Sequence, residues 1–599
     1  MHEMRNKRTM LLNCFLVCCL LTGGTGLAIP IHSKALMSFG LMFSPGASFF
    51  LQPGYQNQIG QKSFGPKLMR PSSFPMAITQ RKPSLPLYSL SEQNFDNFNH
   101  CLDIPGEHLQ EEFLKHASSQ GVKSEYSLKT LEEVDALRFK SLDFTGLLDL
   151  THYHFTTMDN DHSKDLDQAF YISYDGVAKT YRVYYAIADA SYFSVPGTSI
   201  DKEASERVFT TYLPGFDIPV FPRLISEKLC SLVPEKKRRA VVIIMDFSID
   251  GVMLAKRFAH AAIQSRAQLS FRRVQEYYNQ METHPFANKQ YRQSLDHLYT
   301  LGEALVHKAK ERGVVDFGFK ELSIRPDDKQ NIYEISDNTR YRVEKYNEQI
   351  SVAANQAVAE YFIENSLYYI KRFHPSTSNE RLDLARKKLK QLEMPWSYCD
   401  SMRVFVESLQ GTPLHQHIAK SIACRSNLRA KYTGQHNKRG HEGLKISSYA
   451  HFTAPMRRYT DIVNHRILLA HLKGQNVPYQ SNSKQLPRYL RQGFLERYAG
   501  KANRAREREE QIRSNIYDYV SSLLLLPVKD EILTATIVYV NKGGISIRID
   551  KHPFDRWLSA STLPNKELTG VFTEGQSIAV ELEETMIDGH WYLSPQYLF

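Results

Sequence analysis

The sequence is poor in cysteine. Seven cysteines occur among 599 residues, and no two of them form a C-x-x-C pair. Three lie in an apolar run near the N-terminus, and the other four are far apart. This spacing excludes a disulfide framework and a structural zinc site, and it favours a chain that folds in a reducing compartment.

Acidic residues are missing from the N-terminal stretch, with none between Glu3 and Glu92. The apolar run Met10–Leu21 is too short to span a bilayer as a helix, and basic residues before it with small residues after it resemble a secretory signal. A basic, Ser-rich, acid-poor stretch is also typical of an organelle transit peptide, and an unprocessed disordered extension is the third interpretation. We expect residues 1–91 to be this apolar segment and a linker. We expect a cytoplasmic protein, with organelle targeting or export as the alternatives.

Composition and charge indicate a soluble protein with an anionic partner. The chain is 42% hydrophobic and 23% charged, and its length suggests three to four domains. Its net charge of +11 favours nucleic acid or an anionic membrane surface.

Periodicity divides the remainder of the chain. Residues 92–142 have apolar positions three to four apart, which predicts a small helical region. Alternating β-rich segments such as Tyr181–Ala186 and Val241–Phe247 follow, and then helical patterns up to Leu526.

The tail, residues 527–599, changes to short alternating strands separated by glycine turns. Examples are Ile532–Val538, Ile545–Ile549 and Ile578–Leu582. This pattern predicts a small barrel of OB type, with an unspecified β-domain as the alternative.

Four carboxylates occur within nine residues, at Asp159, Asp161, Asp165 and Asp167. Like charges at this density repel unless solvent or a cation separates them, and Mg²⁺ prefers oxygen ligands. A site of this kind can support phosphodiester cleavage. A polar surface turn is the alternative for such a motif taken alone.

Two further motifs are suited to contacting phosphate and bases. Arg457 and Arg458 follow a proline turn and can present planar donors to phosphate, although a structural ion pair is the alternative. Tyr212 lies beside the turn at Pro214-Gly215, where its ring can stack on a base or, alternatively, pack in the core.

These motifs, in this order, resemble those of the ribonuclease II and ribonuclease R family over Asp143 to about Leu526, nearer the ribonuclease II branch. The matching segments are Asp149-Leu150-Thr151-His152, Thr157-Met158-Asp159, Asp165-x-Asp167, Ala186-Ile187-Ala188-Asp189, Pro196-Gly197-Thr198, Tyr212-Leu213-Pro214-Gly215, Leu229-Cys230-Ser231-Leu232, His441-x-Gly443-Leu444 and His451-Phe452-Thr453-x-Pro455-x-Arg457-Arg458-Tyr459.

The resemblance implies an α+β RNB-type ribonuclease domain, residues 143–526, followed by a C-terminal all-β OB-fold RNA-binding domain. It assigns Asp159, Asp165 and Asp167 to a Mg²⁺ site and Arg457 to the scissile phosphate. It also assigns Tyr212 and Phe317 to an RNA clamp, and Arg458 is a further RNA-binding candidate. The expected activity is 3′→5′ hydrolysis of single-stranded RNA to nucleoside 5′-monophosphates. We expect a monomer that needs no membrane partner.

Three departures from the family pattern stand out. Gln168 occupies the position of a fourth aspartate, so we expect it to be a weaker metal ligand, with Asp161 as a candidate to compensate. Phe271 stands where the family has a tyrosine. The 92–142 region is too short for the paired cold-shock domains that commonly precede the catalytic domain. The alternative function is therefore an RNA-binding protein with weakened catalysis.

Overall fold

The computed structural model describes residues 99–102, 106–319, 321–327, 332–338, 340–435, 439–563, 571–587 and 590–597. All of these belong to one compact unit, Leu87–Phe599. The predicted segment 1–91 lies outside the described residues. Within the described residues, no helix is long and apolar enough to cross a membrane.

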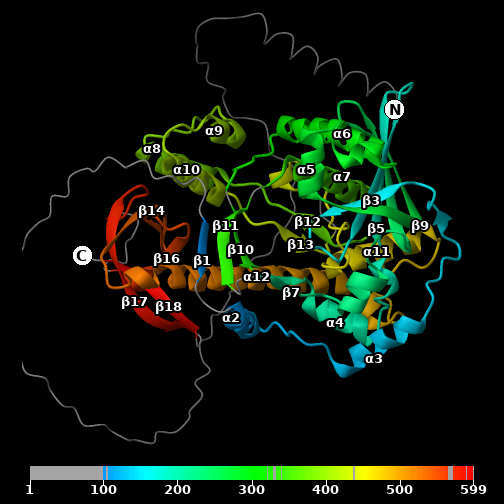
Figure 1. The fold of residues 1–599 in the computed structure, drawn as a ribbon, viewed down its shortest axis with the longest axis horizontal. Helices are drawn as coiled ribbons and strands as arrows, with labels where there is room; N and C mark the ends of the chain where they lie inside the picture. The colour runs from blue at the N-terminus through cyan, green and yellow to red at the C-terminus, as the bar shows by residue number, and fades with distance from the viewer. Residues whose placement is uncertain are drawn as a thin grey trace, which may run out of the picture. The chain divides into compact units, whose positions relative to one another are not determined.

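Five strands of the predicted ribonuclease region form a closed ring. The strands of this ring that are labelled in Figure 1 lie at the right of the view. The ring closes because the long strand β9 pairs antiparallel with β8 through its first part and parallel with β3 through its last part. The five strands are β3 (Phe155–Asp159), β4 (Gln168–Asp175), β5 (Thr180–Ala188), β8 (Lys237–Ser248) and β9 (Met253–Ser270). The short strand β2 (Leu148–Asp149) pairs with β9 outside the ring. The two strands predicted from β-rich alternation, β5 and β8, are confirmed.

Helices cover the ring and share its hydrophobic core. The helices α6 (Arg292–Glu311) and α7 (Arg342–Glu364) approach closely at Gly302. A Cβ atom at Gly302 would lie 2.4 Å from the ring of Tyr346, so only glycine permits this packing. The other helices around this core are α3 (Leu128–Ala136), α4 (Ser199–Arg207), α5 (Phe271–Asn279) and α11 (Tyr459–Leu472).

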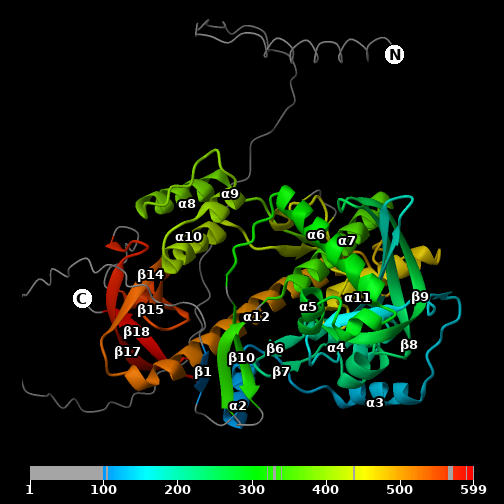
Figure 2. The same ribbon diagram turned by 45° about the horizontal axis from the view of Figure 1, so that its top comes forward.

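The long helix α12 (Gly493–Leu525) joins this core to the tail, as Figures 1 and 2 show. Its 33 residues span about 50 Å at the usual helical rise. Residues such as Leu495 and Tyr498 pack in the main core, whereas Ile512 and Tyr519 pack in a second cluster. Leu525 at its end packs in a third cluster, within the tail, so α12 contributes to three hydrophobic clusters in succession.

The region predicted to be small and helical is tied to distant parts of the chain. It contains α2 (Gly106–Ser119) and α3, but it begins with β1 (Asn99–Leu102), which pairs antiparallel with β11 (Ile332–Asn338). β10 (Glu321–Asp327) completes this three-stranded sheet. Phe113 of α2 packs in the second cluster together with residues of α12 and the tail.

The tail is a five-stranded antiparallel sheet with the order β16-β15-β14-β17-β18. Its edge strands meet, since the guanidinium of Arg556 in β16 donates to the carbonyl of Leu593 in β18 at 2.7 Å. The strands are β14 (Leu533–Asn541), β15 (Gly544–Ile549), β16 (Asp555–Ser559), β17 (Ser577–Ile587) and β18 (His590–Tyr597). Three of these coincide with the predicted strands.

A helical group lies against the tail sheet (Figure 2). It consists of α8 (Asn379–Gln391), α9 (Met402–Ser408) and α10 (Pro413–Ser426). Val538 of β14 is buried in the hydrophobic cluster of these helices, and the Lys388 ammonium donates to the carbonyl of Val540 at 2.6 Å. The tail is therefore packed against the rest of the unit by both apolar and polar contacts.

Candidate active site

The predicted metal-binding aspartates lie where two strands of the ring meet. β3 ends at Asp159 and β4 begins at Gln168. The loop between them, residues 160–167, carries Asp165 and Asp167 and is called the aspartate loop below. Asp167 is only 6% exposed. The sheet thus fixes both ends of the loop and holds its carboxylates close to one another.

Burial separates the carboxyl groups of Asp165 and Asp167 from water. The pKa of Asp165 is raised to about 6, chiefly by burial and then by the charges of Asp159 and Asp217, while Arg457 opposes the shift. Burial raises the pKa of Asp167 well above its usual range, again opposed by Arg457. An added cation would relieve both the desolvation and the mutual repulsion.

The loop Thr453–Arg458, called the arginine loop below, carries the predicted catalytic arginine and is held by several hydrogen bonds. The Met456 N–H donates to Asp167 Oδ1 at 2.9 Å, and the Ala454 N–H donates to Asp461 Oδ2 at 2.9 Å. The Arg457 carbonyl accepts from the Thr210 N–H at 3.1 Å. The position of the loop relative to the aspartates is therefore set by direct hydrogen bonds.

Arg457 is the cation of this site that remains accessible. Its Nε lies 3.7 Å from Asp167 Oδ2, and 41% of its side chain is exposed. A guanidinium placed beside carboxylates and open to solvent can bind an incoming phosphate.

Arg458 has a different environment from its neighbour. It is 9% exposed, and its Nη2 and Nε donate to Asp461 Oδ2 at 2.7 and 3.0 Å. Asp461 in turn is fully buried in the first turn of α11. This buried ion pair argues against the predicted RNA contact and gives Arg458 a structural role.

Tyr212 lies in the hairpin of β6 (Thr211–Leu213) and β7 (Phe216–Ile218) and is 54% exposed. Burial of the hydroxyl raises the pKa of Tyr212, the positive charge of Arg457 opposes the shift, and the negative charges of Asp165 and Asp167 add to it. The turn depends on Gly215, whose φ is +83° and whose Cβ would lie 2.9 Å from Pro326 and Tyr333.

Phe317, the predicted partner of Tyr212, lies in another environment. Its ring stacks on Phe319 at 5.7 Å and packs against the α8–α10 cluster. Among the described contacts, none joins Phe317 to Tyr212. A clamp formed by these two rings would therefore hold RNA between two side chains that do not contact each other.

The two remaining metal candidates are engaged by protein groups. Asp161 pairs with Arg272, with Nε–Oδ2 at 3.2 Å, so its carboxylate already has a cationic partner within the protein. The Gln168 Nε2 donates to the Thr453 carbonyl at 2.7 Å, and its Oε1 accepts from the Tyr185 hydroxyl.

The donor set suits a divalent cation that is completed by its substrate. Among the described residues, no three His, Cys, Asp or Glu side chains are gathered closely enough to hold a metal ion by themselves. Mg²⁺ is commonly held by one or two carboxylates together with water and substrate phosphate. The raised pKa values of Asp165 and Asp167 and the adjacent guanidinium of Arg457 fit that mode of binding.

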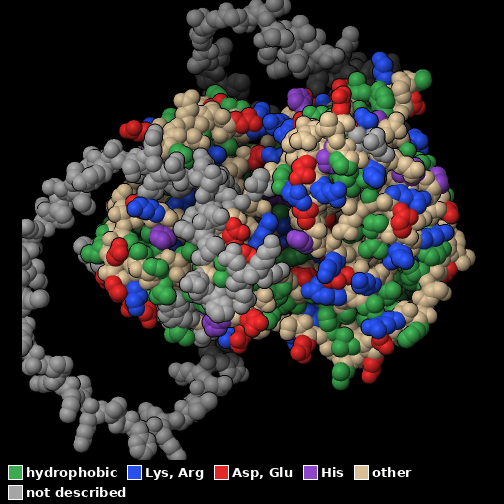
Figure 3. All heavy atoms as spheres, viewed as in Figure 1, with side chains coloured by type: hydrophobic (Ala, Val, Ile, Leu, Met, Phe, Trp, Pro, Cys, Tyr) green, Lys and Arg blue, Asp and Glu red, His purple; other side chains and the backbone are tan. Residues whose placement is uncertain are grey.

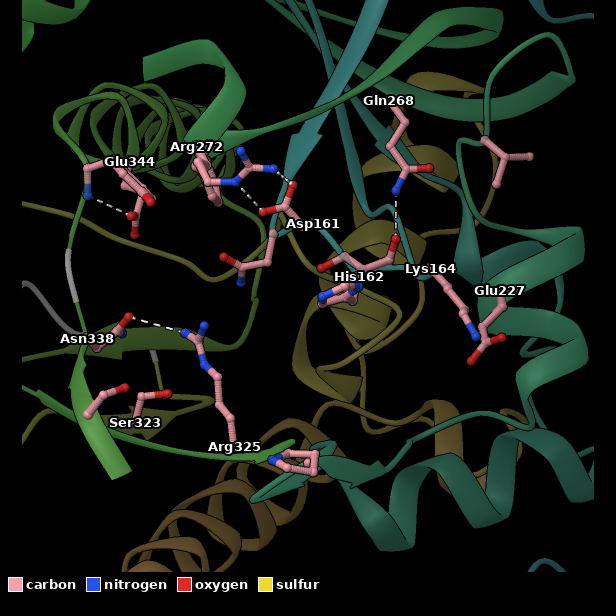
Figure 4. Close-up of a pocket in the computed structure, with 18 of the residues that line it drawn as sticks. Asp161, His162, Lys164, Glu227, Gln268, Arg272, Ser323, Arg325, Asn338 and Glu344 are labelled. Carbon is pink, nitrogen blue, oxygen red and sulfur yellow. Dashed lines mark hydrogen bonds and ion pairs between the residues drawn. The ribbon is translucent and has the colours of Figure 1, made fainter. Parts of the chain in front are cut away.

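A cavity of about 1430 Å³ adjoins the aspartate loop (Figure 4). His162 and Lys164 of this loop point into it, and Arg325 of β10 faces them from the opposite side. Asp161 and Arg272 lie at its wall. The cavity therefore has basic side chains on both sides, with the acidic side chains of Glu227 and Glu344 among them, and residues 160–164 of the loop form part of its wall.

Over one face of the molecule, basic and acidic side chains are interspersed, and the positive charge does not form one continuous patch (Figure 3).

A family description of the RNB domain matches residues 148–474, which is more than half of the chain. The chain belongs to the RNB domain family. Residues from Asp159 to Arg457 lie within the match, so the aspartate loop and the arginine loop are both parts of the RNB domain.

Relatives of this RNB protein include Exoribonuclease 2 of Glaesserella parasuis, 26% identical over 481 residues, covering 74% of this chain and 70% of that protein. Ribonuclease R of Escherichia coli is 27% identical over 429 residues, covering 70% of this chain but only 52% of that protein. The two identities are nearly equal and do not favour either branch.

A solved structure of Mycoplasma genitalium RNase R in complex with ribose methylated single-stranded RNA has a similar fold. Its TM-score is 0.70 at 23% identity, covering 82% of this chain and 78% of that chain. This likeness supports the mixed α/β architecture of the RNB domain.

Several residues of the site had no functional signal in the sequence. Tyr185, Ser351 and Asn355 lie near the Thr453 side chain, on β5 and α7. Tyr185 follows another tyrosine, Tyr184, in the buried part of β5, so the sequence alone does not distinguish it.

Proposed function

We propose that this RNB protein is a 3′→5′ exoribonuclease that hydrolyses single-stranded RNA to nucleoside 5′-monophosphates. The observation that carries the proposal is the direct contact between the aspartate loop and the arginine loop, through Asp167 and Met456. Anionic ligands for a cation and a cation for phosphate therefore lie side by side, as phosphodiester hydrolysis requires.

Asp159, Asp165 and Asp167 would hold a divalent cation, most simply Mg²⁺. When bound, such a cation lowers the pKa of water and polarises a phosphoryl oxygen. Arg457 binds a phosphate oxygen and stabilises the charge that develops on it. Water adds to phosphorus and the P–O3′ bond breaks, so the released nucleotide keeps its 5′-phosphate and the shortened RNA ends in a 3′-hydroxyl.

The 1430 Å³ cavity is the proposed approach for the RNA strand. Lys164 and Arg325 would contact its phosphates from opposite sides, and Tyr212 would stack on a base near the reacting end. A duplex has no free single-stranded 3′ end to place in such a space, so a preference for single strands is expected.

We further propose that residues 143–526 are the ribonuclease domain and that the tail, 527–599, is an OB-type RNA-binding barrel. The five-strand order and the Arg556–Leu593 contact support closure of the tail sheet. Trp557 of β16 is 42% exposed and lies against the turn at Gly544, where an aromatic face is available to a base.

A second candidate function is RNA binding with weakened catalysis. The observation that favours it is the state of Gln168, whose amide is bonded to Tyr185 and Thr453 at a position where the family pattern has an aspartate.

Product analysis distinguishes the two functions. We expect the purified chain with Mg²⁺ to convert a uniform single-stranded RNA into nucleoside 5′-monophosphates, identified by chromatography and mass spectrometry. Nucleoside 3′-monophosphates would contradict the proposed bond cleavage. RNA binding without any release of nucleotide, over a range of Mg²⁺ and Mn²⁺ concentrations, would favour the second function.

A further inference from the structure

The Gln168 side chain uses both ends of its amide within the protein. Its nitrogen donates to the Thr453 carbonyl at 2.7 Å, and its oxygen accepts from the Tyr185 hydroxyl. The first bond reaches a residue 285 positions away, in the loop that carries Arg457. Gln168 thus links the start of β4 directly to the arginine loop.

Tyr185 is fully buried on β5, diagonal to Gln168 across the strand pair. Its hydroxyl lies in a polar cluster between the ring, α7 and the arginine loop. The Ser351 hydroxyl lies 2.8 Å from Thr453 Oγ1, and the Asn355 amide nitrogen donates to that oxygen at 3.3 Å. Buried polar groups of this kind are stabilising only when each finds a partner, and Gln168 supplies one for Tyr185 and one for the Thr453 carbonyl.

Two consecutive residues, Asp167 and Gln168, therefore form hydrogen bonds with the arginine loop. Asp167 accepts from the Met456 N–H, and Gln168 donates to the Thr453 carbonyl three residues earlier. A carboxylate at position 168 has no N–H to donate, so it would place negative charge against the Thr453 carbonyl oxygen. The hydrogen bond to the Thr453 carbonyl therefore requires the amide N–H of Gln168.

We propose that Gln168 is a positioning residue and not a metal ligand: together with Tyr185 it fixes the arginine loop through its two hydrogen bonds. This inference rests on the proposed nuclease function for its kinetic consequence, but its structural content stands apart from turnover. It replaces the expectation that Gln168 is a weak ligand.

Metal binding, measured independently of RNA hydrolysis, tests whether Gln168 is a metal ligand. Mn²⁺ titrations followed by electron paramagnetic resonance compare the intact chain with Gln168→Glu, which keeps the length and adds a charge, and with Asp167→Asn. We expect Gln168→Glu to leave stoichiometry unchanged and affinity within about twofold, whereas Asp167→Asn weakens binding by at least about tenfold. Tighter binding or an additional Mn²⁺ in Gln168→Glu would overturn the inference.

Kinetics test the positioning role. Gln168→Glu and Tyr185→Phe should each lower kcat by about 10- to 100-fold with KM for RNA nearly unchanged, since a displaced Arg457 affects the reacting phosphate more than ground-state binding. The double variant should be little worse than either single variant, because both remove the same link. Tyr184→Phe is the matched control: its hydroxyl, on the same strand, lies 3.2 Å from that of Tyr153 instead.

Additive losses in the double variant, or equal losses in Tyr184→Phe, would contradict the proposed link. Should the intact chain prove unable to hydrolyse RNA, the proposed function fails by itself. Amide hydrogen exchange of residues 453–458 then decides the inference: faster exchange in Gln168→Glu and Tyr185→Phe but not in Tyr184→Phe supports it, and unchanged exchange overturns it.

Discussion

The Asp167 carboxylate accepts a 2.9 Å hydrogen bond from the backbone N–H of Met456, a residue 289 positions later in the chain. This bond couples the candidate cation ligand to the loop that presents Arg457. The carboxylates proposed to bind a cation and the guanidinium proposed to bind phosphate therefore lie on two loops that are directly hydrogen-bonded to each other.

Substituting Asp167→Asn should abolish turnover and leave RNA affinity close to normal. The carboxamide oxygen can still accept from the Met456 N–H, so the loop stays in place while one anionic ligand is lost. We expect kcat to fall by at least about 100-fold, measured in single-turnover assays beside fluorescence anisotropy for RNA binding. Asp161→Asn, whose carboxylate pairs with Arg272, is the control and should retain activity. A parallel loss of binding and turnover in Asp167→Asn would argue against the metal role.

Adjacent arginines should respond in opposite ways. Arg457→Ala should lower kcat by roughly 100- to 1000-fold, as expected for loss of a group that stabilises transition-state charge, with little change in thermal stability. Arg458→Ala should instead destabilise the fold by about 3–5 kcal/mol, because it leaves the buried Asp461 carboxylate unpaired. Thermal unfolding and kinetics on both variants check this contrast. A stable but RNA-deficient Arg458→Ala would restore the original RNA-binding prediction.

The tail should contribute to RNA affinity through Trp557 and the exposed Lys542 in the nearby β14–β15 turn. Trp557→Ala should weaken binding of single-stranded RNA by about 1–3 kcal/mol. Lys542→Ala should reduce the slope of log affinity against log salt by about 0.7. Lys551→Ala removes the same charge at the opposite end of β15, and it should change neither the RNA affinity nor the slope against salt. These point variants are preferable to deletion of Asp530–Phe599, which would remove Val538 and expose the apolar residues of α8–α10 that pack against it. Unchanged binding in Trp557→Ala and Lys542→Ala would remove the tail from the proposed RNA path.

Acid should loosen the contact between α2 and the tail. The His116 ring stacks on His590 at 3.8 Å, and the pKa of His116 is lowered to about 4, first by burial and then by the charge of His590, with Glu112 opposing. Below its ordinary pKa of 6.5 the unfolded chain binds this proton more readily, so stability should fall as pH drops from about 6.5 towards 4.

The matching measurement is the unfolding temperature at pH 7 and pH 5. His116→Phe keeps an aromatic ring and should reduce the fall by a few degrees. His108→Gln, on the exposed side of the same helix, should retain the full fall. An unaltered pH dependence in His116→Phe would show that another group is responsible.

Sequence reasoning predicted the parts of the site that lie within contiguous motifs. The order of the motifs placed Asp159, Asp165, Asp167 and Arg457 in one fold, and alternation predicted strands such as β5 correctly. Local patterns carry this information because strand periodicity and short-range spacing are properties of single segments.

Contacts between distant segments could not be predicted in the same way. Arg458 looks like Arg457 in the sequence, and only the buried Asp461 of the next helix separates their roles. Gln168 looked like a weakened ligand because its partners, Tyr185 and Thr453, lie on other elements. The pairing of β1 with β11 likewise depends on the tertiary fold and has no local signal.

The most direct test of the account uses linear single-stranded RNA labelled at its 5′ end, with a circular RNA of the same sequence beside it. In the presence of Mg²⁺, the linear RNA should shorten progressively from its 3′ end to a core of a few nucleotides, resolved on a denaturing gel, while the circle stays intact. Cleavage of the circle, or internal fragments of many lengths from the first time point, would contradict the proposed 3′→5′ exoribonuclease.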